Sequence, residues 1–150
     1  MRLQRVPKPP FGAADADREP GARGYCNHVT NPIVHFEILG SDGAALIEFY
    51  RGLFGWPIEK QALPGWPDYG IIEAPSQGIG GAVGSADAAG GPAVLIYVEV
   101  DDLAAHIERA VGLGATVAMP VTHLPGTRVT VAWLKDPQGN LLGLLKSREG

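Results

Sequence analysis

Two side chains that can exchange protons, His35 and Glu37, lie two positions apart in the segment Ile33–Leu39. The segment is rich in β-branched and aromatic residues and therefore predicts a strand. Alternate residues of a strand project from the same face, so His35 and Glu37 are expected to share one. A carboxylate near an imidazole raises the basicity of the imidazole, and the pair predicts general acid–base catalysis. The alternative interpretation is a buried histidine that is hydrogen-bonded to a neighbouring strand or turn.

A second group of side chains has types suited to binding a polar or planar ligand. The predicted ligand-binding residues are Tyr97, Glu99, Trp66, Tyr69 and Gly143. Tyr97 and Glu99 can orient a polar ligand, aromatic rings can stack on a planar one, and the glycine leaves space in a pocket. The alternatives are solvation of Glu99 near a strand end and packing of the aromatic rings in a core or a dimer interface.

The composition excludes several classes of protein. The 150 residues carry a net charge of −4, which gives no basic footprint for nucleic acid or for an anionic membrane. Cys26 is the single cysteine, so an intrachain disulfide framework and multi-cysteine metal sites are excluded. No apolar run approaches the roughly 18–20 residues of a membrane-spanning helix, and no signal peptide is evident. We therefore expect a cytoplasmic protein.

The chain divides into an N-terminal extension and one domain. Residues 1–30 contain four prolines, five basic and three acidic residues, and almost no periodic apolar residues. This composition predicts a disordered extension, with a basic arm that docks a partner as the alternative. Residues 31–150 are the predicted domain, with modules at about 31–88 and 92–148.

The domain contains an internal repeat with a shift of 60 residues. The segment DGAALIE from Asp42 aligns with DLAAHIE from Asp102, and Val34 aligns with Val94. Both copies have the same predicted order of elements, a strand, a capped helix and three short strands. A module of this size builds only a marginal core alone, so the two are expected to share one. The sequence thus predicts an α+β fold of paired βαβββ modules.

Hydrophobic spacing predicts which faces of these elements point inward. For the helices, which follow Ser41 or Asp42 and Asp101 or Asp102, the predicted inward residues are Leu46, Phe49, Tyr50, Leu53, Ile107, Ala110 and Val111. For the first strand of each module, the residues expected under the helices are Phe36, Ile38, Ile96 and Val98. The remaining predicted strands cover residues 57–61, 69–73, 79–83, 116–121, 128–134 and 141–146. The opposite strand face is unusually polar, and two sheets that meet across it would enclose a cleft for a ligand.

Five motifs occur in a characteristic order: HFEI from His35, FYRGLFGW from Phe49, GIGGAV from Gly78, VEVDD from Val98 and DPQGN from Asp136. Together they resemble the vicinal-oxygen-chelate superfamily, which comprises glyoxalase I, bleomycin-resistance proteins and extradiol dioxygenases. The resemblance covers about residues 31–148 and most closely concerns small bacterial glyoxalase-like proteins of unassigned activity. It implies that the paired modules form a curved sheet around a cleft.

The resemblance also implies where a divalent metal ion would bind, because enzymes of this superfamily hold one with His or Glu side chains from four strands. His35 matches the first of these positions. Leu95 and Gly143 occupy two others, and residues 80–83, which include the remaining one, are Gly, Gly, Ala and Val. A lone imidazole holds such an ion poorly, so we expect no metal cofactor. A substitute metal site formed by His35, Glu37 and Glu99 is the alternative.

Three functions remain open for a protein that is expected to bind a small molecule in its cleft without the metal centre. The first is a lyase, isomerase or dioxygenase-like enzyme in which His35 and Glu37 are catalytic. The second is sequestration of a planar or glycopeptide-like compound, as in bleomycin-resistance proteins. The third is an interaction domain with a vestigial pocket. Edge strands that need covering favour a homodimer.

Overall fold

The structure is a computed structural model that describes residues 30–76, 78–85 and 89–147. The extension predicted at residues 1–30 lies outside the described residues, apart from Thr30. In chain order, the elements are β1 (Ile33–Gly40), α1 (Gly43–Phe54), β2 (Glu59–Leu63), β3 (Trp66–Ile72), β4 (Gly80–Ser85), β5 (Ala93–Glu99), α2 (Leu103–Gly112), β6 (Thr116–His123), β7 (Val129–Lys135) and β8 (Leu141–Ser147). Neither helix of this described part is long and apolar enough to cross a membrane.

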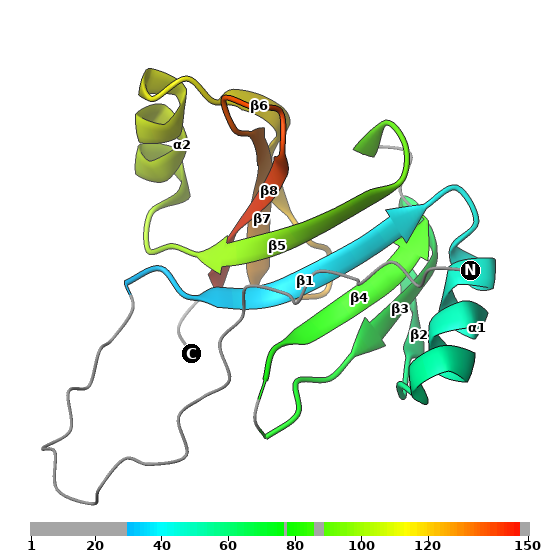
Figure 1. Cartoon of the computed structure of the whole chain (residues 1–150). Coiled ribbons are helices and arrows are strands. Elements are labelled where there is room, and N and C mark those ends of the chain that lie inside the picture. Colours follow the sequence, from blue (N-terminus) through cyan, green and yellow to red (C-terminus); the bar gives the residue numbers. More distant parts are fainter. Residues whose placement is uncertain (1–29, 77, 86–88, 148–150) are drawn as a thin grey trace, which may run out of the picture.

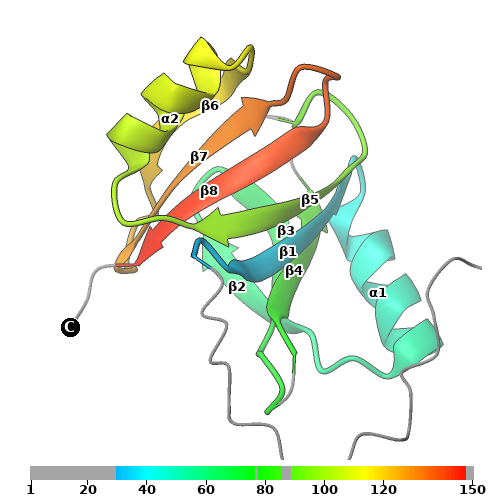
Figure 2. The same cartoon turned by 60° about the vertical axis from the view of Figure 1, so that its left-hand side comes forward.

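The eight strands form one sheet in the order β2-β3-β4-β1-β5-β8-β7-β6. β1 and β5 pair antiparallel at the centre, and each also pairs in parallel with the last strand of its own module, β4 or β8. The strand order therefore reads the same outward from the centre in both modules. The sheet is curved, with α1 beside the strands of the first module and α2 beside those of the second (Figures 1 and 2). These features confirm the predicted α+β fold of paired βαβββ modules.

The two helices begin in the same way. The Oδ1 atoms of Asp42 and Asp102 accept hydrogen bonds from the backbone N–H of Ala45 and Ala105, at 2.9 and 3.0 Å. Each aspartate thereby satisfies one of the free N–H groups of a first helical turn. Gly55, at φ 67°, ends α1 in the left-handed conformation that glycine adopts without strain. Of the predicted alternatives, Ser41 or Asp42 and Asp101 or Asp102, the caps are Asp42 and Asp102.

The predicted inward face of α1 is wrong in part. Ile47 is buried, whereas Phe49 and Leu53 are 57% and 56% exposed. The reason is the close approach of the helix to β4 at Gly43, whose N–H donates to Ser85 Oγ at 2.7 Å. A side chain at residue 43 would collide with the backbone of Ser85. This contact turns the stripe that contains residues 43 and 47 toward the sheet, because residues four apart share a helix face.

Two further predictions of inward residues are wrong. Val111 of α2 is about half exposed, whereas Ile107 and Ala110 pack against the core as predicted. Ile96 of β5 is 38% exposed, while Val98 packs in the cluster beneath α2. α1 packs mainly against β4 and β3, and α2 packs mainly against β6, β7 and β8. Part of β5 therefore has no helix over it.

Candidate functional site

A cavity of about 240 Å³ lies between the two modules, on the sheet face that bears His35, Glu37 and Tyr97. The polar face predicted for β1 and β5 is therefore the cavity face at these three positions. The residues that line the cavity are His35, Glu37, Gln61, Leu63, Tyr69, Ile71, Tyr97, Leu124, Thr127, Val129, Val131 and Leu145. Most of these side chains are apolar, and Glu37 is the one carboxylate among them.

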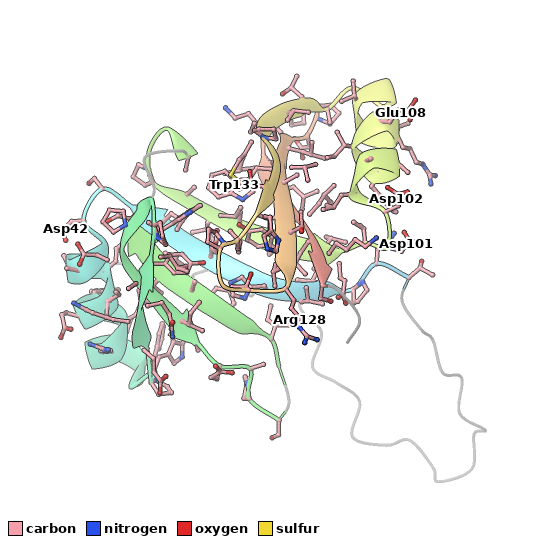
Figure 3. The ribbon with its side chains drawn as sticks, turned by 180° about the vertical axis from the view of Figure 1, so that it is seen from behind. Asp42, Asp101, Asp102, Glu108, Arg128 and Trp133 are labelled. Carbon is pink, nitrogen blue, oxygen red and sulfur yellow. The ribbon has the colours of Figure 1, made fainter. Side chains whose placement is uncertain are left out.

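Glu37 is held by a chain of hydrogen bonds that crosses the cavity wall. The Tyr69 hydroxyl donates to Glu37 Oε1, and the Tyr97 hydroxyl donates to Oε2 at 2.8 Å. The indole Nε1 of Trp133 donates to the Tyr97 hydroxyl at 2.7 Å. Trp133 is fully buried, and it lies on the side of β7 opposite α2 (Figure 3). Side chains from β3, β5 and β7 thus fix the position of the Glu37 carboxylate on β1.

Burial perturbs the protonation of this group. Glu37 is only 4% exposed, and burial raises the pKa of its carboxyl above the ordinary value. The hydrogen bonds from Tyr69 and Tyr97 oppose that shift, because they stabilise the ionised form. Burial and the neighbouring carboxylate raise the pKa of both tyrosines, which are therefore neutral donors at neutral pH.

His35 lies beside this network without joining it. Its ring meets the Tyr97 ring edge-on, with 5.6 Å between the centroids and 66° between the planes. Burial lowers the pKa of His35, so its imidazole is neutral at neutral pH. Within the described residues, no side-chain hydrogen bond joins His35 to Glu37, whose two oxygens each accept one from a tyrosine.

Of the predicted ligand-binding residues, Tyr69 and Tyr97 line the cavity, whereas Trp66, Glu99 and Gly143 do not. Trp66 packs edge-on against Tyr69 and Trp133 and is absent from the cavity lining. Glu99, at the end of β5, accepts a hydrogen bond from the Ser147 hydroxyl and also lies outside the lining. At Gly143, the space that a side chain would need is filled by the Tyr97 ring. The glycine therefore makes room for Tyr97 rather than for a ligand.

The residues at the metal-ligand positions do not fit a divalent ion. His35 supplies one nitrogen, Leu95 is buried in the core, and a side chain at residue 143 would overlap Tyr97. Across residues 30–76, 78–85 and 89–147, no three His, Cys, Asp or Glu side chains are grouped so that they could hold an ion. The alternative set of His35, Glu37 and Glu99 is thus not brought together as a ligand group.

Sequence reasoning missed how Glu37 is held. Glu37 and Tyr97 are equivalent under the 60-residue shift of the repeat, and this relation could have indicated that they meet across the centre of the sheet. It also missed the lining residues from β2 and from the loop before β7, among them Gln61, Leu63 and Thr127. These residues show no periodicity or motif that marks them.

The symmetric sheet and the cavity between its halves define a protein of the glyoxalase-like class. The family model described as the Glyoxalase/Bleomycin resistance protein/Dioxygenase superfamily matches residues 32–144. The chain belongs to this superfamily. Among curated proteins, no sequence matches the chain significantly.

Several solved structures share the fold at low sequence identity. A variant of Streptomyces coelicolor methylmalonyl-CoA epimerase in complex with 2-nitronate-propionyl-CoA is 21% identical, with a TM-score of 0.56 over 80% of this chain and 99% of that one. Methylmalonyl-CoA epimerase from Mycobacterium tuberculosis is 17% identical, with a TM-score of 0.58 over 78% and 88%. A hypothetical protein from Bacillus halodurans is 19% identical, with a TM-score of 0.58 over 81% and 98%. At these identities, the similarity establishes the fold.

Proposed function

We propose that the protein binds a small organic molecule in the cavity between its modules, with Glu37 as the polar anchor and without a metal ion. The observation that carries this proposal is the position of Glu37, a carboxylate that is 4% exposed yet lines a cavity. Placing a charged group there costs free energy unless it has partners. Three further side chains, Tyr69, Tyr97 and Trp133, are arranged around this one group.

The cavity suits a compact ligand with an apolar body. Ligand pockets are mostly apolar with a few placed polar groups, and they usually enclose about 300–1,000 Å³. The volume of about 240 Å³ lies just below that range. A large conjugate such as a coenzyme A thioester would place only its smaller end inside. The size therefore favours a small metabolite that the cavity encloses.

Proton transfer by Glu37 is a second candidate function. The raised pKa and the burial of this carboxyl are typical of a general base or acid. In such a reaction, a Glu37 oxygen would take a proton from the bound molecule and return it to another position. Exchange of ligand C–H for deuterium in heavy water, followed by NMR, would detect this step. Exchange that is lost in Glu37→Gln would support catalysis.

The binding proposal is tested by screening a metabolite library by NMR against protein that has been treated with EDTA. We expect at least one compound to shift the resonances of Tyr69, Tyr97 and the Trp133 indole. In Val131→Phe the new ring fills the cavity, so these shifts should disappear, whereas the matched change Val111→Phe on exposed α2 should leave them. Leu63→Phe repeats the test with a half-buried lining residue if Val131→Phe fails to fold. Binding only elsewhere on the protein, or only with an added divalent ion, would overturn the proposal.

A further inference from the structure

The cavity wall contains one carboxyl group, Glu37, and no side chain of the described lining that is positively charged at neutral pH. Glu37 is the one buried charged side chain of the described residues. The cavity lining formed by those residues includes neither lysine nor arginine, and His35 is neutral because burial lowers its pKa. A buried carboxylate is costly when no opposite charge compensates it. A molecule that brings a positive charge into the cavity would supply the missing interaction.

The directions of the hydrogen bonds make Glu37 an acceptor toward the cavity. An indole N–H can only donate, so the Tyr97 oxygen accepts from Trp133 and its own hydrogen is free for Glu37 Oε2. Tyr69 donates to Oε1. Two donors on two oxygens fit an ionised carboxylate, and each of its oxygens can still accept a second hydrogen bond. The group therefore selects a ligand that donates hydrogen bonds and disfavours an anion.

The rings around Glu37 also favour a cation. Tyr69, Tyr97 and the neutral ring of His35 line the cavity beside the carboxylate. A ring face attracts a cation, and the attraction grows when water is excluded, so any face of these rings that the ligand meets adds to the attraction of Glu37. The remaining wall is aliphatic, which suits a hydrocarbon body. Glu37 is not one of the four metal-ligand positions of the superfamily, so a cation bound to Glu37 would occupy a different site.

From these three observations we propose that the ligand is an organic cation, a protonated amine on a small apolar body, whose ammonium group pairs with Glu37 between the rings of Tyr69 and Tyr97. The inference rests on the proposed function, because it concerns the same cavity. It adds the chemical class of the ligand, which neither the superfamily nor the fold assigns. An aromatic or alicyclic methylamine represents the expected shape.

The test compares three probes of nearly equal size: benzylammonium, neutral benzyl alcohol and anionic benzoate. Affinities are measured by NMR titration of the Trp133 indole at a pH where the amine is charged and Glu37 is ionised in the complex. We expect benzylammonium to bind at least about tenfold more tightly than benzyl alcohol, and benzoate to bind most weakly. The preference should vanish in Glu37→Gln, which retains an amide of nearly the same shape.

Glu108→Gln is the matched control, since it removes the same charge from an exposed position on α2 (Figure 3). This variant should keep the full preference of the wild-type protein for the cation. Equal or tighter binding of benzyl alcohol or benzoate would overturn the cation inference while leaving small-molecule binding intact. Failure of all three probes to bind would also overturn it, and the metabolite screen would then decide separately whether the cavity binds any compound. If Glu37→Gln fails to fold, the order of the three probes on wild-type protein still decides.

Discussion

The carboxylate of Glu37 accepts a hydrogen bond from the hydroxyl of Tyr97, the residue at the equivalent position of the second module, 60 residues later. β1 and β5 are adjacent and antiparallel at the centre of the sheet, so equivalent positions of the two strands lie near its approximate twofold axis. Duplication alone would place the same residue type at both positions. Here one copy carries an acceptor and the other a donor, and the pair ties the two modules together at the cavity.

Tyr97→Phe should destabilise the protein, because the Tyr97 hydroxyl both donates to Glu37 and accepts from Trp133. Its loss leaves a buried indole N–H without a partner and removes one donor from a buried carboxylate. We expect the free energy of unfolding to fall by about 1–3 kcal/mol, as measured by urea denaturation. Tyr50→Phe is the control, because Tyr50 packs among the rings of Phe54 and Trp56. Equal, small effects of both changes would show that the hydrogen-bond chain contributes nothing to stability.

Between about pH 4.5 and 6.5, the stability of the described part of the protein should depend on pH through Glu37 and His35, with opposite signs. The pKa of Glu37 is raised in the folded state, so above its ordinary value of 4.5 the folded protein binds more protons and stability falls as pH rises. The pKa of His35 is lowered from 6.5, so just below that pH the unfolded protein binds more protons and stability rises with pH. The two slopes partly cancel where their windows overlap.

Single variants separate these two contributions. In Glu37→Gln, protonation of His35 remains, and the free energy of unfolding should increase as pH rises toward 6.5. In His35→Gln, ionisation of Glu37 remains, and the free energy of unfolding should decrease as pH rises above 4.5. Each slope is limited to about 1.4 kcal/mol per pH unit for one proton. Urea denaturation at intervals of pH would measure them, and parallel curves for the two variants would refute this assignment.

Local chemistry explains which parts of the fold could be predicted from the sequence. The helix caps at Asp42 and Asp102 and the turn at 136–140 depend on residues within four positions of each other. The turn is held by Asp136, whose carboxylate accepts from the N–H of Gln138 and Asn140. Strand alternation likewise placed Glu37 and Tyr97 on one face, because that property belongs to each strand separately.

Contacts between distant segments explain what could not be predicted. The stripe of α1 that faces the sheet is set by Gly43 against Ser85, 42 residues away. The hydrogen bond from Tyr69 on β3 to Glu37 on β1 spans the strand between them, β4, so it depends on the order of the strands in the sheet. Glu99 has the strand phase of Tyr97, yet at the end of β5 it meets Ser147. Residue type and spacing therefore do not predict these partners.

Two glycine-to-alanine changes should have opposite effects on stability. A methyl group at residue 143 would overlap the Tyr97 ring, so Gly143→Ala should lower the free energy of unfolding by about 1–3 kcal/mol. It should also displace the Tyr97 hydroxyl from Glu37. Gly52 lies on the exposed side of α1, where an added methyl meets nothing within 4 Å. Gly52→Ala should therefore stabilise the helix by about 0.5–1 kcal/mol. An unchanged free energy of unfolding in Gly143→Ala would mean that the Tyr97 ring moves aside without cost.

Purified protein should contain no stoichiometric divalent metal, and EDTA should leave its melting temperature unchanged. Structural and catalytic sites for zinc use three or four nitrogen, oxygen or sulfur ligands, and the four positions of the superfamily offer one, His35. Leu95 is packed in the core, and the space at Gly143 is taken by Tyr97, so neither position can be completed by a small movement. Elemental analysis and thermal unfolding with and without added zinc, nickel, iron or manganese would check this. One equivalent of metal per chain that is lost in His35→Ala would restore the metalloenzyme interpretation, since the imidazole would then be a ligand.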